Sequence, residues 1–480
     1  MRYFCAVKRK NKKVTLEKVL VESYAAEGKS IARANGKVIF IEKAVPGDVA
    51  DVFLFKSKKD WGEGTVTHFH SYSTDRIQPF CTHFGVCGGC QWQMLTYEKQ
   101  LEYKQQQVED QLKRIGKIEL PEIKKIMGAD KNTHYRNKME YTFGNKRFLL
   151  KEELHNENIK GEDDVAGFHA KGVFDKVVDI DECFLQSEPT NAIRNWVKEF
   201  GKKNSFSFYD IKLHEGFLRT MQLRICTTGE IMVNVVVGND DEAKINLLMG
   251  EMLKIFPSIT TLLYTINTKH NDSMYDLDPQ VYYGNGFVLE KLSTGSSGED
   301  FYFKIGPKSF FQTNTYQGEK LYQVTRDFAQ LTGNEIVYDL YCGTGSIGIF
   351  VSKLAKKIIG VETIKEAVDD AKENVLLNKI THSEFFAGDV IDICTDDFFA
   401  QHGRPDVIIT DPPRVGMHEK LVKKLLEIEA QRIVYVSCNV ATQARDLQLL
   451  NEKYVVEAIQ PVDMFPHTHH IENVVALRLS

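Results

Sequence analysis

The stretch "EIVYDLYCGTGSIGIFVSKLAKKIIGVE" (residues 335–362) decides the expected fold of the last third of the chain. It starts with a short run of β-formers, continues through a glycine loop into a helical pattern, and ends in a second run of β-formers that closes on Glu362. Strand, loop, helix and strand in this order are typical of two parallel strands joined by a crossover helix. The stretch therefore predicts a doubly wound parallel sheet.

The same alternation continues downstream. Residues 366–380, "EAVDDAKENVLLNKI", predict a helix, and "PDVIITDPPR" (405–414) and "QRIVYVSCN" (431–439) predict strands. In parallel sheets of this kind, ligands bind beyond the carboxyl ends of the strands. The residues that we expect to share this edge are Gly343, Gly345, Glu362, Asp411 and Cys438.

The glycine loop "DLYCGTGSIG" (339–348) fits the pattern G-x-G-x-x-G, which is a weak signal by itself. Asp339 stands before the loop, and a carboxylate there suits a cationic or hydroxyl-bearing ligand better than a pyrophosphate. Glu362, at the end of the next strand, is placed to accept ribose hydroxyls. S-adenosylmethionine has a ribose and a sulfonium but no phosphate, so it is the predicted cofactor, with NAD as the alternative.

A free thiol is predicted at the end of one strand. In "IVYVSCNVAT" (433–442), Cys438 follows the apolar run, whereas buried cysteines usually lie inside such a run as small hydrophobes. The segment "DMFPHTHHIENVVAL" (463–477) adds three histidines and Glu472 before a final strand. A Cys–His hydrolase pair and a histidine metal site are two alternatives, the second with poor ligand geometry.

Methyl transfer to a pyrimidine carbon needs a thiolate, a base and a methyl donor. Carbon 5 of uracil is too weak a nucleophile to attack a sulfonium, but addition of a thiolate to carbon 6 makes carbon 5 carbanion-like. A base must then remove the proton from carbon 5 so that the thiolate can leave. Cys438, Glu472 and the glycine loop would supply the thiolate, the base and the methyl donor.

A cysteine cluster precedes the central part of the chain. "CTHFGVCGGCQWQ" (81–93) places Cys81, Cys87 and Cys90 close together, and Cys183 is a distant fourth. Crowded thiolates in a reducing compartment indicate a bridging cation. Four thiolates suit zinc or an iron–sulfur cluster, and the C-x5-C-x2-C spacing favours the cluster.

The amino-terminal part of the chain has a different pattern. Residues 14–70 are predicted to form short strands with turns between them, the size of a small OB-like β-barrel. Residues 1–70 carry 14 Lys or Arg against 8 Asp or Glu, with "KRKNKK" at 8–13, so an RNA or DNA partner and a solvated basic tail are both compatible with the charge. Residues 117–300 mix strands and helices.

The bulk composition is that of a soluble globular protein. The chain has 480 residues, 42% hydrophobic and 26% charged, which predicts about three domains. It lacks an apolar run of the ~18 residues that cross a membrane, and its start lacks a signal core, so we expect a cytoplasmic protein. An odd count of nine cysteines argues against a disulfide framework.

These motifs together resemble the RNA uracil-5-methyltransferase family, in particular its iron–sulfur-containing branch that methylates 23S rRNA. The resemblance rests on "EGKSIARANGKVIFIEKAVPGD", "FGVCGGCQWQMLTYEKQLEYK", "HYRNKMEYTFG", "SFFQTNT", "YDLYCGTGSIGIF", "TDPPRVG", "VSCN" and "DMFPHTHHIENV", in this order along nearly the whole chain. It implies three domains: a TRAM-like, RNA-binding β-barrel at 1–72, an α+β central domain with the cluster cysteines at 73–303, and a Rossmann-like methyltransferase domain at 304–480.

The resemblance also implies roles for individual residues. Cys438 would be the nucleophile, and Glu472 the proton acceptor. The positions that it assigns to S-adenosylmethionine are Gln312, Tyr341, Gly343, Gly345, Ser346, Glu362, Asp389 and Asp411, and those that it assigns to a 4Fe-4S cluster are Cys81, Cys87, Cys90 and Cys183. The expected reaction is methylation of carbon 5 of a specific uridine in 23S rRNA, without a membrane or an obligate protein partner. A tRNA uridine-5-methyltransferase and a non-catalytic RNA-binding or ribosome-assembly protein are the alternatives.

Overall fold

The computed structural model describes residues 14–150, 152–154, 162–295 and 298–480. The chain divides into two compact units. The first comprises Met1–Gly85, Gly89–Tyr103 and His467–His469, and the second Val86–Gly88, Lys104–Pro466 and His470–Ser480. The basic segment at 8–13 lies outside the described residues.

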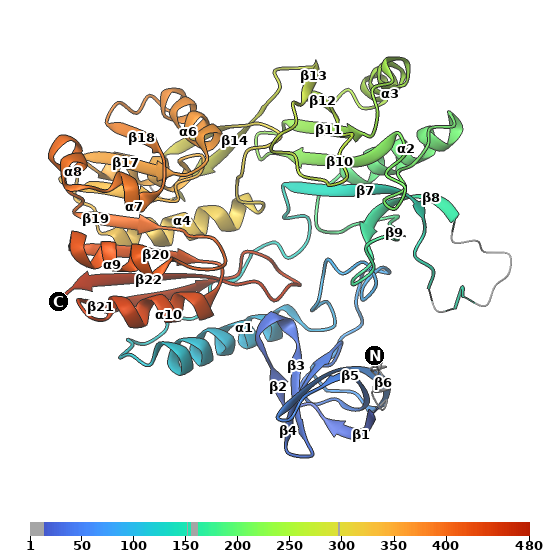
Figure 1. Cartoon of the computed structure of the whole chain (residues 1–480), viewed down its shortest axis with the longest axis horizontal. Helices are drawn as coiled ribbons and strands as arrows, with labels where there is room; N and C mark the ends of the chain where they lie inside the picture. Colours follow the sequence, from blue (N-terminus) through green and yellow to red (C-terminus); the bar gives the residue numbers. More distant parts are fainter. Residues whose placement is uncertain (1–13, 151, 155–161, 296–297) are drawn as a thin grey trace, which may run out of the picture. The chain divides into compact units, whose positions relative to one another are not determined.

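The first unit contains a six-stranded sheet with the order β1-β5-β6-β4-β3-β2, drawn in blue in Figure 1. Its strands are β1 (Val14–Leu20), β2 (Ser23–Tyr24), β3 (Ser30–Ala34), β4 (Lys37–Glu42), β5 (Val49–Ser57) and β6 (Trp61–Ser71). All neighbours are antiparallel except β4 and β6. The short strands predicted for this region are therefore present, while its identity as a TRAM domain stays a prediction.

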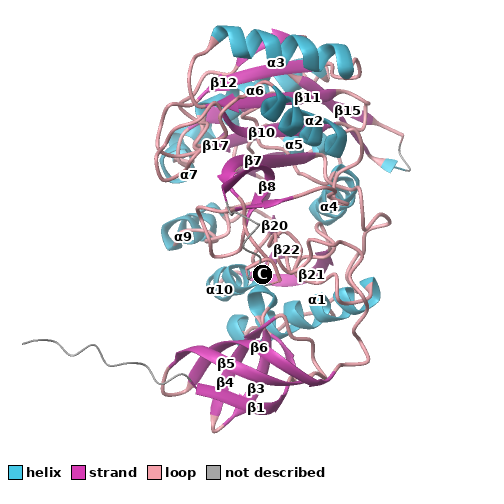
Figure 2. Cartoon of the chain, turned by 90° about the vertical axis from the view of Figure 1, so that its right-hand side faces the viewer, coloured by secondary structure: helices cyan, strands magenta, loops and turns pink. Residues whose placement is uncertain are grey.

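Apart from Val86–Gly88, the second unit starts at Lys104 within helix α1 (Tyr97–Gln111). It contains a seven-stranded central sheet of the order β13-β12-β11-β10-β7-β8-β9. Its strands are β7 (Lys138–Lys146), β8 (Glu162–His169), β9 (Val177–Asp179), β10 (Leu218–Ile225), β11 (Ile231–Val237), β12 (Thr261–Ile266) and β13 (Gln280–Tyr283). Helices α2 (Thr190–Lys203) and α3 (Glu242–Ile255) pack on it through one hydrophobic core. Both lie beside this sheet in Figures 1 and 2.

A hairpin and a second seven-stranded sheet complete this unit. The hairpin consists of β14 (Val288–Ser293) and β15 (Asp300–Ile305). The sheet has the order β18-β17-β16-β19-β20-β22-β21. Its strands are β16 (Ile336–Leu340), β17 (Lys357–Glu362), β18 (Ser383–Ala387), β19 (Val407–Thr410), β20 (Arg432–Ser437), β21 (Tyr454–Val462) and β22 (Glu472–Leu479).

Five neighbouring strands of this sheet, β16 to β20, run parallel, as the alternating pattern predicted. Strand β22 lies antiparallel between β20 and β21. The helices around the sheet are α4 (Thr315–Ala329), α5 (Ser346–Val351), α6 (Lys365–Leu377), α7 (Val390–Ile393), α8 (Asp396–His402), α9 (Glu419–Ile428) and α10 (Val440–Leu450). Among the residues that the structure describes, none of the helices has the length and apolar character needed to span a membrane.

Candidate active site

The carboxyl ends of the parallel strands meet at one edge of the sheet. Leu340 pairs with Val361 on one side and with Thr410 on the other, and Thr410 pairs with Tyr435. The residues that follow these strand ends are Tyr341, Glu362, Asp411 and Cys438. The structure thus brings together at one edge the groups that the alternation of strands and helices predicted.

Cys438 is half-buried directly after β20. Burial raises the pKa of its thiol to about 11, and the negative charges of Glu472 and Asp411 add to this increase. The Arg414 side chain acts in the opposite direction, through its positive charge and a hydrogen bond to the thiol. The nucleophile predicted from sequence therefore lies within electrostatic reach of two carboxyl groups and one guanidinium.

Glu472 is the first residue of β22 and is buried. Its place next to the thiol follows from the sheet, because Ser437 on β20 pairs with Asn473 on β22. Burial raises the pKa of Glu472 well above its ordinary value, Asp411 raises it further, and Arg414 lowers it. Burial also raises the pKa of Asp411 to about 7.

Arg414 is the functional candidate that the sequence interpretation missed. Its backbone carbonyl accepts hydrogen bonds from Asn439 Nδ2 at 2.9 Å and from Thr442 Oγ1 at 3.3 Å, which anchors the loop after β19 to the start of α10. Its Nη2 lies 3.2 Å from His470 Nδ1. A thiolate that forms beside two carboxyl groups needs a cation nearby. Arg414 is the basic residue of the motif "TDPPRVG", so the sequence did contain a signal for its role.

The glycine loop connects β16 to α5. Its backbone has positive φ at Gly343 (53°) and Gly345 (77°), a conformation that glycine adopts without strain. Tyr341, just before them, also has positive φ (61°). Glu362 Oε2 accepts a hydrogen bond from Gly343 N at 3.1 Å, so the carboxylate at the end of β17 holds the loop.

Asp339 lies beneath this loop and is 1% exposed. Its Oδ2 accepts a hydrogen bond from Gly348 N at 2.8 Å, whereas its buried Oδ1 has no partner among the described residues. Burial raises the pKa of Asp339 to about 7, and the charges of Asp411 and Glu362 add to this. A buried carboxyl oxygen without a partner suits a bound ligand that carries a positive charge or a hydrogen-bond donor. The loop thus fits S-adenosylmethionine.

The other predicted cofactor residues surround the loop. Ser346 Oγ lies 2.8 Å from Tyr322 Oη. Gln312 is buried, and its backbone carbonyl accepts a hydrogen bond from Asn137 Nδ2 at 2.8 Å. Asp389 is exposed at the start of α7, where its side chain accepts a hydrogen bond from Ile391 N at 2.9 Å. Burial raises the pKa of Tyr341 to about 12, and the charge of Asp389 is the next largest cause.

The structure does not bring the four predicted cluster cysteines together as a metal site. Cys81 and Cys90 belong to the first unit, and Cys87 and Cys183 to the second. Cys87 and Cys183 pack against the same small core around Ala170, Val178 and Ile180. The structure shows no group of three or more His, Cys, Asp or Glu side chains arranged for a metal ion within the ranges that it describes. The predicted iron–sulfur site is therefore not supported.

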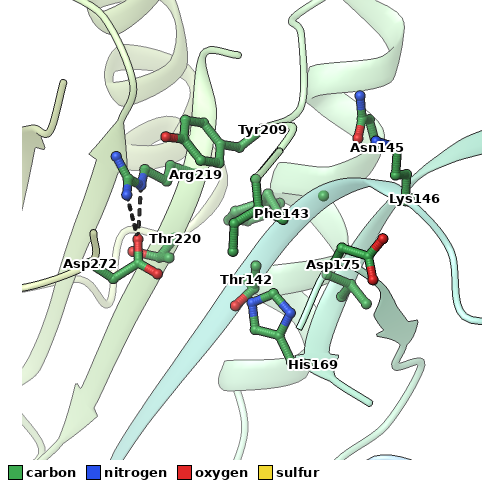
Figure 3. Close-up of a pocket in the computed structure, with 13 residues that line it drawn as sticks. Thr142, Phe143, Asn145, Lys146, His169, Asp175, Tyr209, Arg219, Thr220 and Asp272 are labelled. Atoms are coloured by element: carbon green, nitrogen blue, oxygen red, sulfur yellow. Dashed lines mark hydrogen bonds and ion pairs between the residues drawn. The ribbon is translucent and has the colours of Figure 1, made fainter. Parts of the chain in front are cut away.

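A pocket on the central sheet, shown in Figure 3, is too small for a substrate. It has a volume of about 20 Å³, which is room for roughly one water molecule. Arg219 and Asp272 form an ion pair at its border, 2.8 Å apart, and His169 lies beside Thr142 (Figure 3). We assign no catalytic role to this pocket.

The parallel sheet, the glycine loop with its acidic partner and the antiparallel β22 define the class of S-adenosylmethionine-dependent methyltransferases. The sequence model of the tRNA (uracil-5-)-methyltransferase family matches residues 278–479. An uncharacterized RNA methyltransferase of Bacteroides thetaiotaomicron is 51% identical over 458 residues, which cover 95% of this chain and 100% of that protein. One of Porphyromonas gingivalis is 47% identical over 464 residues, covering 95% and 98%.

A solved structure agrees with these relatives. The Pyrococcus abyssi tRNA (uracil-54, C5)-methyltransferase in complex with S-adenosyl-L-homocysteine has a TM-score of 0.72 and 27% sequence identity, and the match covers 96% of this chain and 100% of that one. The chain belongs to the RNA uracil-5-methyltransferase family and is an S-adenosylmethionine-dependent RNA methyltransferase. The predictions of the family, of the methyl donor and of RNA as the substrate class are confirmed.

Proposed function

We propose that this enzyme methylates carbon 5 of a uridine through a covalent bond between Cys438 Sγ and carbon 6 of the base. The observation that carries the proposal is that Cys438 and Glu472 adjoin the paired residues Ser437 and Asn473, with Asp411 and Arg414 close enough for their charges to act on both side chains, at the edge of the sheet that holds the glycine loop. Bound S-adenosylmethionine would supply the methyl group. Glu362, Asp339, Gln312 and the loop glycines would hold it.

The thiol must lose its proton before it can attack. With a pKa of about 11, roughly one Cys438 in ten thousand is a thiolate at pH 7 in the free enzyme. We assign the thiol proton to Asp411, because Glu472 must stay ionised to accept a second proton later. Arg414 then stabilises the thiolate through its charge and its hydrogen bond to Sγ.

The bond changes balance around the uracil ring. Cys438 Sγ bonds to carbon 6, and the electrons of the C5–C6 double bond move toward carbon 5 and the carbonyl at carbon 4. Carbon 5 would take the methyl group from the donor, and the electrons of the broken methyl–sulfur bond would stay on the sulfur, so that S-adenosylhomocysteine leaves. Glu472 accepts the proton that carbon 5 still carries. The electrons of that C–H bond restore the double bond and expel the thiolate. A buried carboxylate with a raised pKa is a suitable base for this last step.

The substrate that we propose is a uridine in 23S rRNA, in a loop or flipped from a helix so that both faces of the ring are reachable. What supports rRNA is the resemblance carried by the four cysteines. The family model and the solved relative are both described as tRNA enzymes, so tRNA is the second candidate. We also propose the division into an RNA-binding β-barrel at 1–72, a central domain at 73–303 and a methyltransferase domain at 304–480.

The 4Fe-4S cluster remains part of the proposal only through the resemblance, and no step of the reaction depends on it. Iron and acid-labile sulfide would be measured in protein purified without oxygen. We expect about four of each per chain, both lost in Cys87→Ser and Cys183→Ser and retained in Cys226→Ser, whose thiol is buried and outside the predicted set. Protein without iron in all variants would remove the cluster from the account.

Trapping of the covalent adduct tests the reaction. Glu472→Gln should accumulate a protein–RNA species that survives denaturing gels, because addition and methylation proceed but proton removal does not. Total rRNA and total tRNA from a strain that lacks this gene would be offered separately, so the RNA that forms the adduct identifies the substrate. Cys438→Ala in the Glu472→Gln background is the control and should form none. An adduct that persists in this double variant would disprove Cys438 as the nucleophile.

A further inference from the structure

The central sheet has one apolar and one polar face near β7 and β10. Residues that point to the apolar face pack with α2 and α3. The alternate residues, which share the other face, are Lys138, Glu140 and Thr142 on β7 and Thr220, Gln222 and Arg224 on β10. Glu140 on this face is exposed, but Arg224 is buried, and a buried guanidinium requires an explanation.

Two cations lie directly opposite each other on this face. Lys138 pairs in register with Arg224 across the antiparallel strands. Like charges in this position destabilise a sheet unless something compensates them. Burial lowers the pKa of Lys138, and the charge of Arg224 lowers it further.

Arg224 is a nearly fully buried guanidinium with few hydrogen bonds. It is 2% exposed, its Nη1 donates to Asn137 Oδ1 at 3.4 Å, and its buried Nε has no partner. Within the described ranges, neither Arg224 nor Lys138 takes part in an ion pair. A buried charge in this state is costly without a counterion.

The neighbouring carboxylates act on the two cations through their charge, but the described residues include no ion pair between them. Glu290 lies close enough to affect Arg224, but its oxygens already accept hydrogen bonds from Thr227 N at 2.8 Å and from Thr315 Oγ1 at 2.8 Å. Glu140 is exposed and accepts a hydrogen bond from Gln222 Nε2 at 3.2 Å. In the part of the chain that the structure describes, neither carboxylate accepts a hydrogen bond from these two cations, so the buried Nε of Arg224 keeps its capacity to donate to an anion.

Asn137 connects the pair to the active site. Its Oδ1 receives the Arg224 hydrogen bond, while its Nδ2 donates to Gln312 O at 2.8 Å and to Thr315 Oγ1 at 2.9 Å. One side chain thus separates the cation pair from the segment that carries Gln312. An anion bound at the pair would therefore lie one side chain away from the backbone of Gln312, a predicted cofactor residue.

We propose that Lys138 and Arg224 bind one phosphate of the RNA backbone near the methylated nucleotide. An arginine fork with a neighbouring ammonium is well suited to a phosphate, and contacts of this kind fix the register of a nucleic acid without reading its sequence. The inference rests on RNA as the substrate and not on the covalent mechanism. The methionine carboxylate of the cofactor is the competing anion, and the experiment separates the two.

The test measures binding of a mixed-sequence, 20-nucleotide single-stranded RNA to the full chain over a series of KCl concentrations. Lys138→Gln should weaken binding about threefold to tenfold near 0.1 M salt, and lower the slope of log affinity against log salt by about 0.7 to 0.9, the value for one lost phosphate contact. Lys138→Arg should retain the wild-type slope. Lys254→Gln, on α3 at the opposite face, loses the same charge and should behave as wild type.

Two further measurements test whether Lys138 binds phosphate rather than the cofactor. S-adenosylhomocysteine should bind Lys138→Gln as it binds wild type, and inorganic phosphate should raise the melting temperature of wild type more than that of Lys138→Gln. A slope in Lys138→Gln equal to that in Lys254→Gln would overturn the proposal, and so would a selective loss of S-adenosylhomocysteine binding. Because binding needs no catalysis, the experiment remains decisive in the Cys438→Ala background even if no covalent adduct ever forms.

Discussion

Lys104 and Asp463 form an ion pair in which both side chains are fully buried, with 2.6 Å between Nζ and Oδ1. Lys104 lies on α1, and Asp463 follows β21 at the start of the segment that leads to Glu472. Lys104 Nζ also donates to Phe465 O at 3.2 Å, and Gln317 Nε2 donates to Asp463 O at 2.8 Å. The segment that carries the proposed base is thus fixed by buried side chains from two helices.

Removal of the lysine alone should be strongly destabilising. Lys104→Met leaves Asp463 buried without its counterion, and we expect a loss of about 3–5 kcal/mol in the free energy of unfolding. Lys104→Met with Asp463→Asn should recover much of this loss, since the amide oxygen still accepts the hydrogen bond from Phe465 N. Urea denaturation would measure both. Lys365→Met, which breaks the exposed pair with Asp369, is the control and should leave the urea midpoint almost unchanged.

The reactivity of Cys438 should depend on its charged neighbours. Arg414→Gln removes a cation that lowers the pKa of the thiol, so alkylation by iodoacetamide should become slower at every pH below 10. Asp411→Asn removes a negative charge and should make alkylation faster. Mass spectrometry of Cys438 after timed exposure would measure the rates. The buried thiols of Cys226, Cys342 and Cys394 serve as internal references, and equal rates in the two variants would contradict the arrangement.

Asp339 should make stability depend on pH. Its pKa is about 7 in the folded chain, against an ordinary value of 3.8, so the folded state binds a proton that the unfolded state has released between these values. The contribution is fully present below pH 4 and is lost as the pH rises through 7. Asp339→Asn, without cofactor, should therefore be more stable than wild type at pH 8, by up to about 4 kcal/mol, and equal to it at pH 4.

The same substitution should weaken cofactor binding, because the buried Oδ1 without a partner is what we assign to the ligand. Calorimetric titration with S-adenosylhomocysteine would measure the affinity. A variant that is more stable and still binds normally would show that Asp339 serves the fold alone.

Gly348 should tolerate no side chain. It lies in α5, and a Cβ placed there would be 2.9 Å from Asp339 Oδ2 and 3.0 Å from Ile358 Cγ2. Gly348→Ala should therefore displace the carboxylate, lower the melting temperature and weaken S-adenosylhomocysteine binding. Gly250→Ala in α3 has its nearest atom at 3.5 Å and should gain up to about 1 kcal/mol from helix propensity. Similar melting temperatures for the two variants would argue against this close approach.

Some of these features were predictable from sequence and others were not. The alternation from 335 to 439 predicted the parallel strands, and with them the common edge for Glu362, Asp411 and Cys438, because strand direction alone places those residues. Helix α1 continues as a short π-helix at Leu112–Gly116. Its charged appearance gave no sign that Lys104 is buried, because the counterion lies 359 residues away in the sequence. The cross-strand pair of Lys138 and Arg224 depends on the register of β7 and β10, which local patterns do not determine.

The two chemically active side chains belong to adjacent strands, since Cys438 follows β20 and Glu472 opens β22, and the ladder pairs Ser437 with Asn473. Their separation is therefore set by main-chain hydrogen bonds of the sheet rather than by the histidine-rich connection between β21 and β22. Substitutions in that connection should therefore leave the spacing of the two groups unchanged as long as the β20–β22 ladder stays paired.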